Sequence, residues 1–194
     1  MNKFIFIISS TILFSCSQPD YKNPHIVIYT AYGDMELELF PEQAPATVAA
    51  FLSYIDSGFY TNSSFYRVVL LEGLSPAGNT GLIQGGTWQT NDKLHPFVPG
   101  IVHESTKQTR LSHTNGTISL ARTTAGTAST EFFICIGDQT QFDFGNGGAG
   151  DDGLGFAAFG TVFKGMATVR KIQVQRKNDQ RFVEKIIINK IERR

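Results

Sequence analysis

Residues that often carry catalysis or bind metal ions are few in this chain, and their spacing matches no common reactive site. Asp151 and Asp152 stand before Gly153 in a glycine-rich stretch, but the surrounding residues do not complete a calcium-binding EF-hand loop. The run at 145–148 is not followed by the Lys-Ser/Thr pair of a phosphate-binding loop. The histidines lack metal-ligand spacing with one another and with cysteine: His25, His95, His103 and His113. The sequence therefore predicts a chemistry that uses no metal ion and no cofactor.

The first residues have the pattern of a secretory leader. Lys3 precedes an apolar run over 4–14, which is too short to span a bilayer comfortably but is typical of the core of a signal peptide. The run ends in Leu13-Phe14-Ser15-Cys16, which resembles a bacterial lipobox and implies cleavage before Cys16 and lipid on that residue. The alternatives are an ordinary signal peptide with an incidental cysteine, or a buried N-terminal helix. The small residue before Cys16 favours the lipobox.

This interpretation divides the chain into three parts and gives it a location. Residues 1–15 are a lipoprotein signal peptide, 16–24 a lipidated tether, and 25–194 the folded domain. We expect the protein in the bacterial cell envelope, attached to the inner or outer membrane through Cys16. Cys135 then has no disulfide partner, and its apolar neighbours predict a buried core residue rather than a reactive thiol.

The composition is that of one globular domain with a tail. The chain has 194 residues, of which 41% are hydrophobic and 18% charged. Seventeen basic and seventeen acidic residues balance, so no basic field indicates a nucleic-acid partner. We therefore expect no nucleic-acid partner. We also expect a monomer.

The pattern of apolar residues predicts a mainly β domain with few helices. Helical spacing begins at Pro45 and ends at Gly58, and a second short helix is expected at 165–172. Glycine-rich stretches predict long loops at 72–81 and 138–155. Strands are expected at 25–32, 35–40, 65–71, 82–84, 117–121, 131–136, 156–162 and 182–191. This order favours a closed or nearly closed antiparallel barrel capped by helices.

Several segments, in order and across nearly the whole mature chain, resemble the cyclophilin family. Each is weak alone, but six or seven in register are specific. They are Phe40-Pro41 with the helix start at 44–52, Asp56-Ser57-Gly58-Phe59-Tyr60, Phe65-Tyr66-Arg67-Val68-Val69, Ile83-Gln84-Gly85-Gly86, and the stretches 116–122, 129–134 and 159–166. The resemblance implies a closed eight-stranded antiparallel barrel with two helices. It also implies peptidyl-prolyl cis-trans isomerase activity on proline-containing polypeptides, with a proline pocket on the outer face.

That reaction needs no nucleophile, because it only rotates a peptide bond whose barrier is ~18–20 kcal/mol. The enzyme must bind the twisted state better than either planar state. A guanidinium aimed at the proline nitrogen can do so, since it stays charged and donates several hydrogen bonds. A lone arginine on a strand is usually a surface residue, but the flanking resemblance favours catalysis for Arg67.

The resemblance implies roles for ten residues. Gln84 is expected to bind the substrate backbone and Phe133 to form the pocket floor, and both belong to the catalytic set with Arg67. The expected substrate-binding residues are Phe65, Leu82, Ala121, Arg122, Glu131, Phe142 and Phe156. For each phenylalanine the alternative is an ordinary core position; Phe132 and Phe133 point opposite ways, so at most one faces the pocket.

Three departures from the family pattern bear on the site. Residues 72–80 form an apparent insertion, expected to be a surface loop beside the pocket. Gly81 stands where a pocket phenylalanine is expected. Glu131 replaces a glutamine and is expected to orient Arg67 through a charge-assisted hydrogen bond. Strand alternation is expected to place Phe65, Arg67 and Val69 on one face.

Two functions from different classes follow. The first is an active isomerase that assists the folding of secreted or envelope proteins. The second is a binding module or chaperone that holds proline segments and isomerises them weakly. A small-ligand barrel of the lipocalin kind lacks support from the segment Gln84-Gly85-Gly86.

Overall fold

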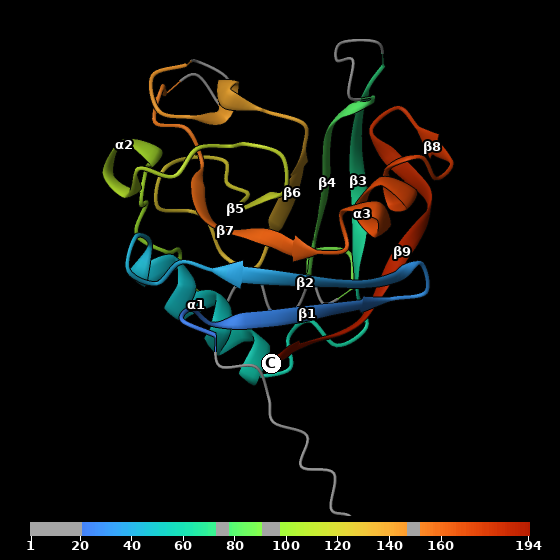
Figure 1. Ribbon diagram of the computed structural model, residues 1–194, viewed down its shortest axis with the longest axis horizontal. Helices are drawn as coiled ribbons and strands as arrows, with labels where there is room; N and C mark the ends of the chain where they lie inside the picture. Colours follow the sequence, from blue (N-terminus) through green and yellow to red (C-terminus); the bar gives the residue numbers. More distant parts are fainter. Residues whose placement is uncertain (1–20, 73–77, 91–97, 147–151) are drawn as a thin grey trace, which may run out of the picture.

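The computed structural model describes residues 21–72, 78–90, 98–146 and 152–194 (Figure 1). The expected signal peptide, the expected lipidation site Cys16 and most of the expected tether lie outside these residues. So do 73–77, the greater part of the apparent insertion at 72–80. The predictions for these segments therefore have no structural counterpart here.

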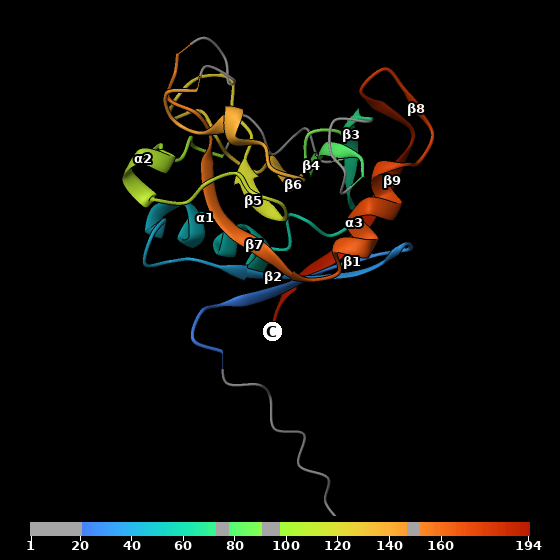
Figure 2. The same cartoon turned by 45° about the horizontal axis from the view of Figure 1, so that its top comes forward.

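Eight antiparallel strands close into a barrel, as the resemblance implied (Figures 1 and 2). The strand order is β1-β2-β7-β5-β6-β4-β3-β9, and pairing of β1 with β9 closes the ring. A ninth, two-residue strand, β8 (Lys177–Asn178), pairs with β9 and lies outside the ring. The barrel strands are β1 His25–Thr30, β2 Gly33–Leu39, β3 Ser63–Leu71, β4 Thr80–Gly86, β5 Thr117–Leu120, β6 Phe132–Ile136, β7 Ala157–Lys164 and β9 Arg181–Arg193.

The two expected helices are present, and two shorter helical turns accompany them within the described residues. α1 (Pro45–Asp56) and α3 (Met166–Gln173) lie at different ends of the barrel (Figures 1 and 2). α2 (Thr106–Thr109) is a single turn and η2 (Thr140–Phe142) a 3-10 turn, both too short for a periodic pattern to predict. Within the part of the chain that the structure describes, no helix is long and apolar enough to cross a membrane.

The N-terminus of α1 is satisfied by a distant side chain. Pro45 begins the helix, and its preceding residue provides no side-chain cap. The buried Glu104 carboxylate instead accepts hydrogen bonds from the backbone N–H groups of Ala46 (3.1 Å) and Thr47 (2.8 Å). A negative charge is favourable at this end of a helix, where N–H groups otherwise lack partners.

The barrel interior is a continuous apolar core. Phe51 of α1 packs against the rings of Tyr60, Phe132 and Phe159, with centroids 5.0–5.6 Å apart. Ile172 of α3 is fully buried in the same cluster. This core fixes the strands whose outward residues form the candidate site.

A β-bulge in β3 decides which of its side chains reach the outer face. The pairing with β4 shifts between Phe65, opposite Gly85, and Arg67, opposite Gln84. Phe65 and Val68 are both buried in the barrel core, whereas Arg67 lies outside it. The expectation that Phe65 and Arg67 share a face is wrong, because the extra residue of the bulge reverses the alternation between them.

Candidate active site

Arg67, Gln84 and Phe133 lie in one row across three neighbouring strands. Arg67 of β3 pairs with Gln84 of β4, and Gln84 pairs with Phe133 of β6. Residues directly opposite in an antiparallel sheet point to the same face, with neighbouring strands ≈ 4.7–4.9 Å apart. The three residues predicted to be catalytic are thus brought together on the outer face of the barrel.

A chain of hydrogen bonds connects Arg67 to a carboxylate. Arg67 Nη1 donates to Gln84 Oε1 (2.9 Å), and Gln84 Nε2 donates to the Tyr66 hydroxyl (2.9 Å). Tyr66 in turn donates to Glu131 Oε2 (2.7 Å). Glu131 therefore acts on Arg67 through Tyr66 and Gln84, and this chain fixes which end of the Gln84 amide faces the guanidinium.

Backbone donors hold the Glu131 carboxylate in place. Its Oε1 accepts hydrogen bonds from the N–H groups of Thr87 (2.8 Å) and Trp88 (2.9 Å). Burial of Tyr66, and then the nearby charge of Glu131, raise the pKa of the Tyr66 hydroxyl well above its ordinary value. Tyr66 thus remains a donor at any physiological pH.

A second side chain grips Arg67 from the opposite side. Gln180, which follows β8, accepts hydrogen bonds at Oε1 from Arg67 Nε (3.0 Å) and Nη2 (2.5 Å). Arg67 also lines a cleft of about 260 Å³ with Asn178, Asp179, Gln180 and Arg181. The guanidinium therefore lies between Gln84 and the turn that joins β8 to β9.

A separate apolar cluster lies beside this row, outside the barrel core. Phe133, Phe142 and Phe156 meet edge to face, with ring centroids 5.2–5.5 Å apart. Such arrangements are favourable for aromatic rings. The remaining members are the buried Leu82 and Cys135 and the partly buried Val69 and Ala121. The predicted pocket residues Leu82, Ala121, Phe133, Phe142 and Phe156 therefore do come together, and Cys135 is a buried free thiol as predicted.

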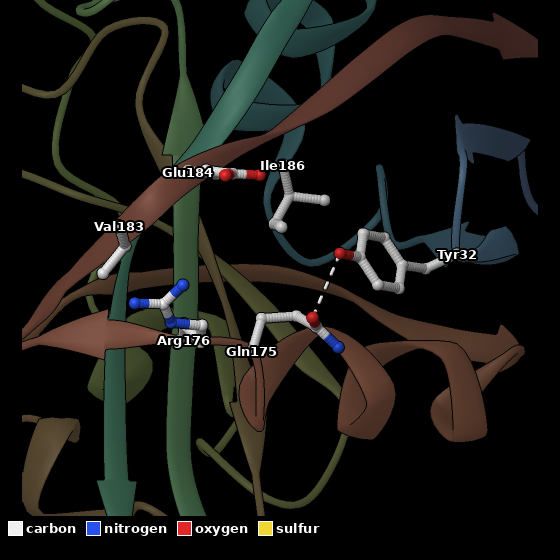
Figure 3. A pocket seen from close by; sticks show the side chains of 6 residues that line it. All are labelled: Tyr32, Gln175, Arg176, Val183, Glu184 and Ile186. Atoms are coloured by element: carbon white, nitrogen blue, oxygen red, sulfur yellow. Dashed lines mark hydrogen bonds between the residues drawn. The ribbon is translucent and has the colours of Figure 1, made fainter.

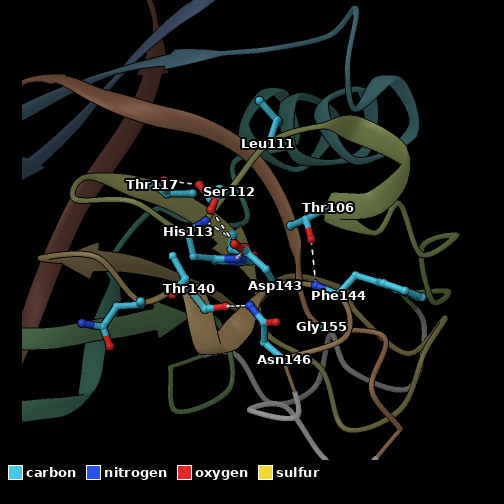
Figure 4. Close-up of polar contacts among 12 residues, drawn as sticks. Thr106, Leu111, Ser112, His113, Thr117, Thr140, Asp143, Phe144, Asn146 and Gly155 are labelled. Carbon is cyan, nitrogen blue, oxygen red and sulfur yellow. Dashed lines mark hydrogen bonds and ion pairs between the residues drawn. The ribbon is translucent and has the colours of Figure 1, made fainter.

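His113, which the sequence did not indicate as a site residue, packs against Phe133 of this cluster. Its ring stacks against Phe133, with centroids 5.9 Å apart and planes 13° apart. Nδ1 lies 2.6 Å from Asp143 Oδ1 (Figure 4). Nε2 lies 3.0 Å from Ser119 Oγ. Burial lowers the pKa of His113, although Asp143 opposes that effect.

The order Asp143, His113, Ser119 is that of a hydrolase triad, but the serine cannot serve as a nucleophile. Ser119 and His113 are both fully buried, so no substrate carbonyl can approach the Ser119 hydroxyl. Asp143 also accepts hydrogen bonds from the His113 backbone N–H (3.0 Å) and from the Ser112 hydroxyl. These bonds instead hold Asp143, and with it the adjacent Phe142, against the strand that carries Ser119.

Arg122 lies beside the cluster and is engaged by the loop before β7. It donates from Nη1 to Asp152 Oδ2 (2.6 Å) and from Nη2 to Asp152 Oδ1 (2.8 Å). Nε and Nη2 also donate to the Gly155 carbonyl, and the guanidinium lies 5.5 Å from the Phe156 ring centroid. Its side chain is only 1% exposed. Arg122 therefore positions Phe156, in addition to lining the path beside the pocket.

We expect Asp152 to titrate far below an ordinary aspartate. The hydrogen bonds from Arg122, and then the one from the Leu154 N–H, lower the pKa of Asp152 from 3.8 to about 2. The pair contributes stability above the unfolded-state pKa, and this contribution is lost as the pH falls through about 2. A carboxyl-carbon NMR titration should give a midpoint near 2 in the native protein and a clearly higher one in Arg122→Gln, which keeps only the bond from the Leu154 N–H.

The matched control is Arg110→Gln, which removes an arginine that makes no hydrogen bond to Asp152. It should leave the Asp152 midpoint unchanged. An unchanged midpoint in Arg122→Gln would show that the Arg122 bonds do not set this titration.

A cleft of about 270 Å³ adjoins the row on the side away from Gln180. Most of its lining residues are polar: Gln84, Ala121, Arg122, Thr123, Thr127, Ser129 and Glu131. Four sequence-predicted site residues therefore line one surface depression next to the apolar cluster.

Two predicted features of the pocket need correction or explanation. Phe65 is fully buried in the barrel core against Phe132, so it does not join the other substrate-binding candidates. At Gly81 the backbone has φ +127°, and an added Cβ would meet the Val69 carbonyl oxygen at 2.1 Å. No side chain fits at this position, and Val69 packs against the apolar cluster from the neighbouring strand.

Two further observations concern the described residues outside this site. Among residues 21–72, 78–90, 98–146 and 152–194, no group of three or more His, Cys, Asp or Glu side chains is arranged to hold a metal ion. A hollow of about 90 Å³ lies between Tyr32, Gln175 and Ile186, where Tyr32 donates to Gln175 Oε1 (3.1 Å; Figure 3). This hollow contains none of the predicted site residues.

Comparison with known proteins concerns the fold and the activity rather than the individual residues of the site. Residues 25–193 match the model of the family described as cyclophilin type peptidyl-prolyl cis-trans isomerase/CLD. Peptidyl-prolyl cis-trans isomerase A of Dickeya dadantii is 35% identical over 156 residues, which cover 79% of this chain and 74% of the relative. Peptidyl-prolyl cis-trans isomerase B of Escherichia coli is 33% identical over 156 residues, covering 76% and 83%.

A solved structure supports the fold. The crystal structure of a Cryptosporidium parvum cyclophilin type peptidyl-prolyl cis-trans isomerase superposes with a TM-score of 0.70 at 22% identity. The superposition covers 89% of this chain and 98% of the other. It confirms the closed barrel, whereas the sequence relatives carry the inference about activity.

Proposed function

Because the chain belongs to the cyclophilin-type peptidyl-prolyl cis-trans isomerase family, we propose that it isomerises X-Pro bonds of secreted or envelope proteins at the face bearing Arg67. The observation that carries this proposal is the row Arg67–Gln84–Phe133. It sets a charged donor beside the apolar cluster that contains Phe133, Phe142 and Phe156.

The proposed mechanism divides the work between the two parts of the site. The substrate proline ring lies on Phe133, between Phe142 and Leu82, and Gln84 binds the neighbouring backbone. As the amide twists, its nitrogen becomes pyramidal and accepts a hydrogen bond from Arg67. This bond exists only in the twisted state, so it lowers the barrier rather than simply tightening binding.

The magnitudes require both parts of the site. A hydrogen bond to a charged group contributes ~1.5–3 kcal/mol net. A millionfold rate gain requires ~8 kcal/mol. The remainder must come from packing of the proline ring against the apolar cluster of Phe133, Phe142 and Phe156, and from the prior orientation of Arg67 by its acceptors.

A protease-coupled assay on short X-Pro peptides tests this function. We expect catalysed isomerisation by the domain 25–194, with a rate that depends on the residue before proline. Tight peptide binding with a rate near the uncatalysed one would instead favour a proline-segment binding module. The absence of both catalysis and binding would contradict the proposed site altogether.

The proposed location rests on the sequence Leu13-Phe14-Ser15-Cys16. We propose that a monomer is held to the envelope membrane by lipid on Cys16, so that the active face meets polypeptides after export. Cys16→Ser should abolish labelling by radioactive fatty acid and release the protein into the soluble fraction. Equal labelling of the wild type and the variant would contradict the anchor without bearing on the isomerase.

A further inference from the structure

We propose that Gln180 is a positioning residue that sets the direction of the Arg67 guanidinium. Its single Oε1 atom accepts from Nε at 3.0 Å and from Nη2 at 2.5 Å. Because two N–H groups of Arg67 bind the same oxygen, the Gln180 amide fixes the direction in which that edge of the guanidinium points. Gln180 lies 113 residues from Arg67 in the sequence, on the turn that joins β8 to β9.

The two amide acceptors leave Arg67 both oriented and available. Gln84 takes one N–H from Nη1, and Gln180 takes the N–H of Nε and one from Nη2. A guanidinium has five N–H groups, so one remains on each terminal nitrogen for the substrate. Both acceptors are neutral carbonyls, which orient the cation without cancelling its charge as a carboxylate would.

The position of Gln180 does not depend on its bond to Arg67. The backbone carbonyl oxygen of Gln180 accepts a hydrogen bond from the backbone N–H of Val68 at 2.8 Å, which connects the turn to β3. The next residue, Arg181, pairs with Arg67 in register, and its guanidinium lies 5.5 Å from the Trp88 ring centroid. These contacts remain when the Gln180 side chain is removed, so the effect of Gln180→Ala reports on the side chain alone.

This inference rests on the proposed role of Arg67 as the donor, and the first experiment measures kcat/KM and peptide affinity together. Gln180→Ala should lower kcat/KM about tenfold and leave the dissociation constant for an X-Pro peptide within about twofold. Asn178→Ala is the matched control, because Asn178 lines the same cleft and its side chain makes no hydrogen bond within the described residues. It should stay within about twofold of the wild type in both quantities.

A double-mutant comparison separates positioning from a general structural effect. In an Arg67→Ala background, adding Gln180→Ala should change the remaining rate by less than about twofold, because no guanidinium is left to orient. The Arg67 Nε–H resonance in NMR spectra should also shift and exchange faster with water in Gln180→Ala. A merely structural role would move neither readout in this way.

Two results would overturn the inference about Gln180. One is a Gln180→Ala rate within twofold of the wild type. The other is an equal loss in the presence and absence of Arg67. By contrast, an Arg67→Ala variant that isomerises at the wild-type rate would overturn the proposed mechanism itself, so the two failures are distinguishable.

Discussion

Arg67→Ala should slow isomerisation of X-Pro peptides at least a hundredfold while the barrel stays folded. The variant loses the donor that meets the pyramidal nitrogen, and ~2.7 kcal/mol of selective stabilisation corresponds to that factor. Because the bond forms mainly in the twisted state, peptide binding should weaken far less than turnover. The measurements are kcat/KM in the protease-coupled assay and the dissociation constant by calorimetry.

Lysine should rescue this variant poorly. The three hydrogen bonds from Arg67 to Gln84 and Gln180 use the planar fork, which an ammonium group cannot reproduce. Arg176→Ala is the matched control, since Arg176 lines the separate hollow beside Tyr32 and makes no hydrogen bond to Arg67, Gln84 or Gln180. It should keep activity within about threefold. A folded Arg67→Ala protein, checked by circular dichroism, with wild-type turnover would exclude Arg67 as the donor.

Strand periodicity predicted a mainly β barrel, and the family resemblance supplied the number of strands and the residues expected in the apolar cluster. Strands with apolar faces have a period of two, and β6 shows why this suffices. Phe132 enters the core and Phe133 the outer cluster, as alternation requires. The motif resemblance then placed Leu82, Phe142 and Phe156 around Phe133, and the register of the barrel strands is compatible with that placement.

The polar surroundings of Arg67 were less predictable, because they depend on geometry that no periodic pattern records. The bulge between Phe65 and Arg67 reverses the faces of β3 and brings Tyr66 into the chain that ends at Glu131. Gln180 follows a two-residue strand, which is too short to produce a pattern. A bulge or a distant hairpin changes contacts without changing hydrophobic periodicity.

His113 illustrates a different limit of sequence reasoning. Its spacing excluded a metal site, but a histidine can also pack as a neutral aromatic ring. The partner that makes this possible, Asp143, lies 30 residues further along and directly after Phe142. Burial of His113 favours the neutral ring, so stacking against Phe133 adds no charge to the pocket. The one indication in the sequence that Asp143 lies near the apolar cluster is its position directly after Phe142.

Phe133→Ala should lower kcat/KM about a hundredfold, mainly by weakening peptide binding. Arg67→Ala, by contrast, should act mainly on turnover. Phe133 is 2% exposed, and its ring contacts Phe142, Phe156 and His113. Its removal takes away the surface on which the proline ring lies, and ~2.7 kcal/mol corresponds to a hundredfold. The lost packing should also reduce the free energy of unfolding by about 3 kcal/mol.

Urea unfolding and calorimetric titration with an X-Pro peptide separate the two effects of this substitution, both measured where the variant is still folded. Phe163→Ala is the matched control, because Phe163 is 47% exposed on β7 and packs against Tyr21 and His25, away from the pocket. It should change stability by less than about 1 kcal/mol and leave the peptide dissociation constant unchanged. If Phe133→Ala loses stability but binds peptide with wild-type affinity, Phe133 is a packing residue only. The proline ring must then lie elsewhere on the barrel.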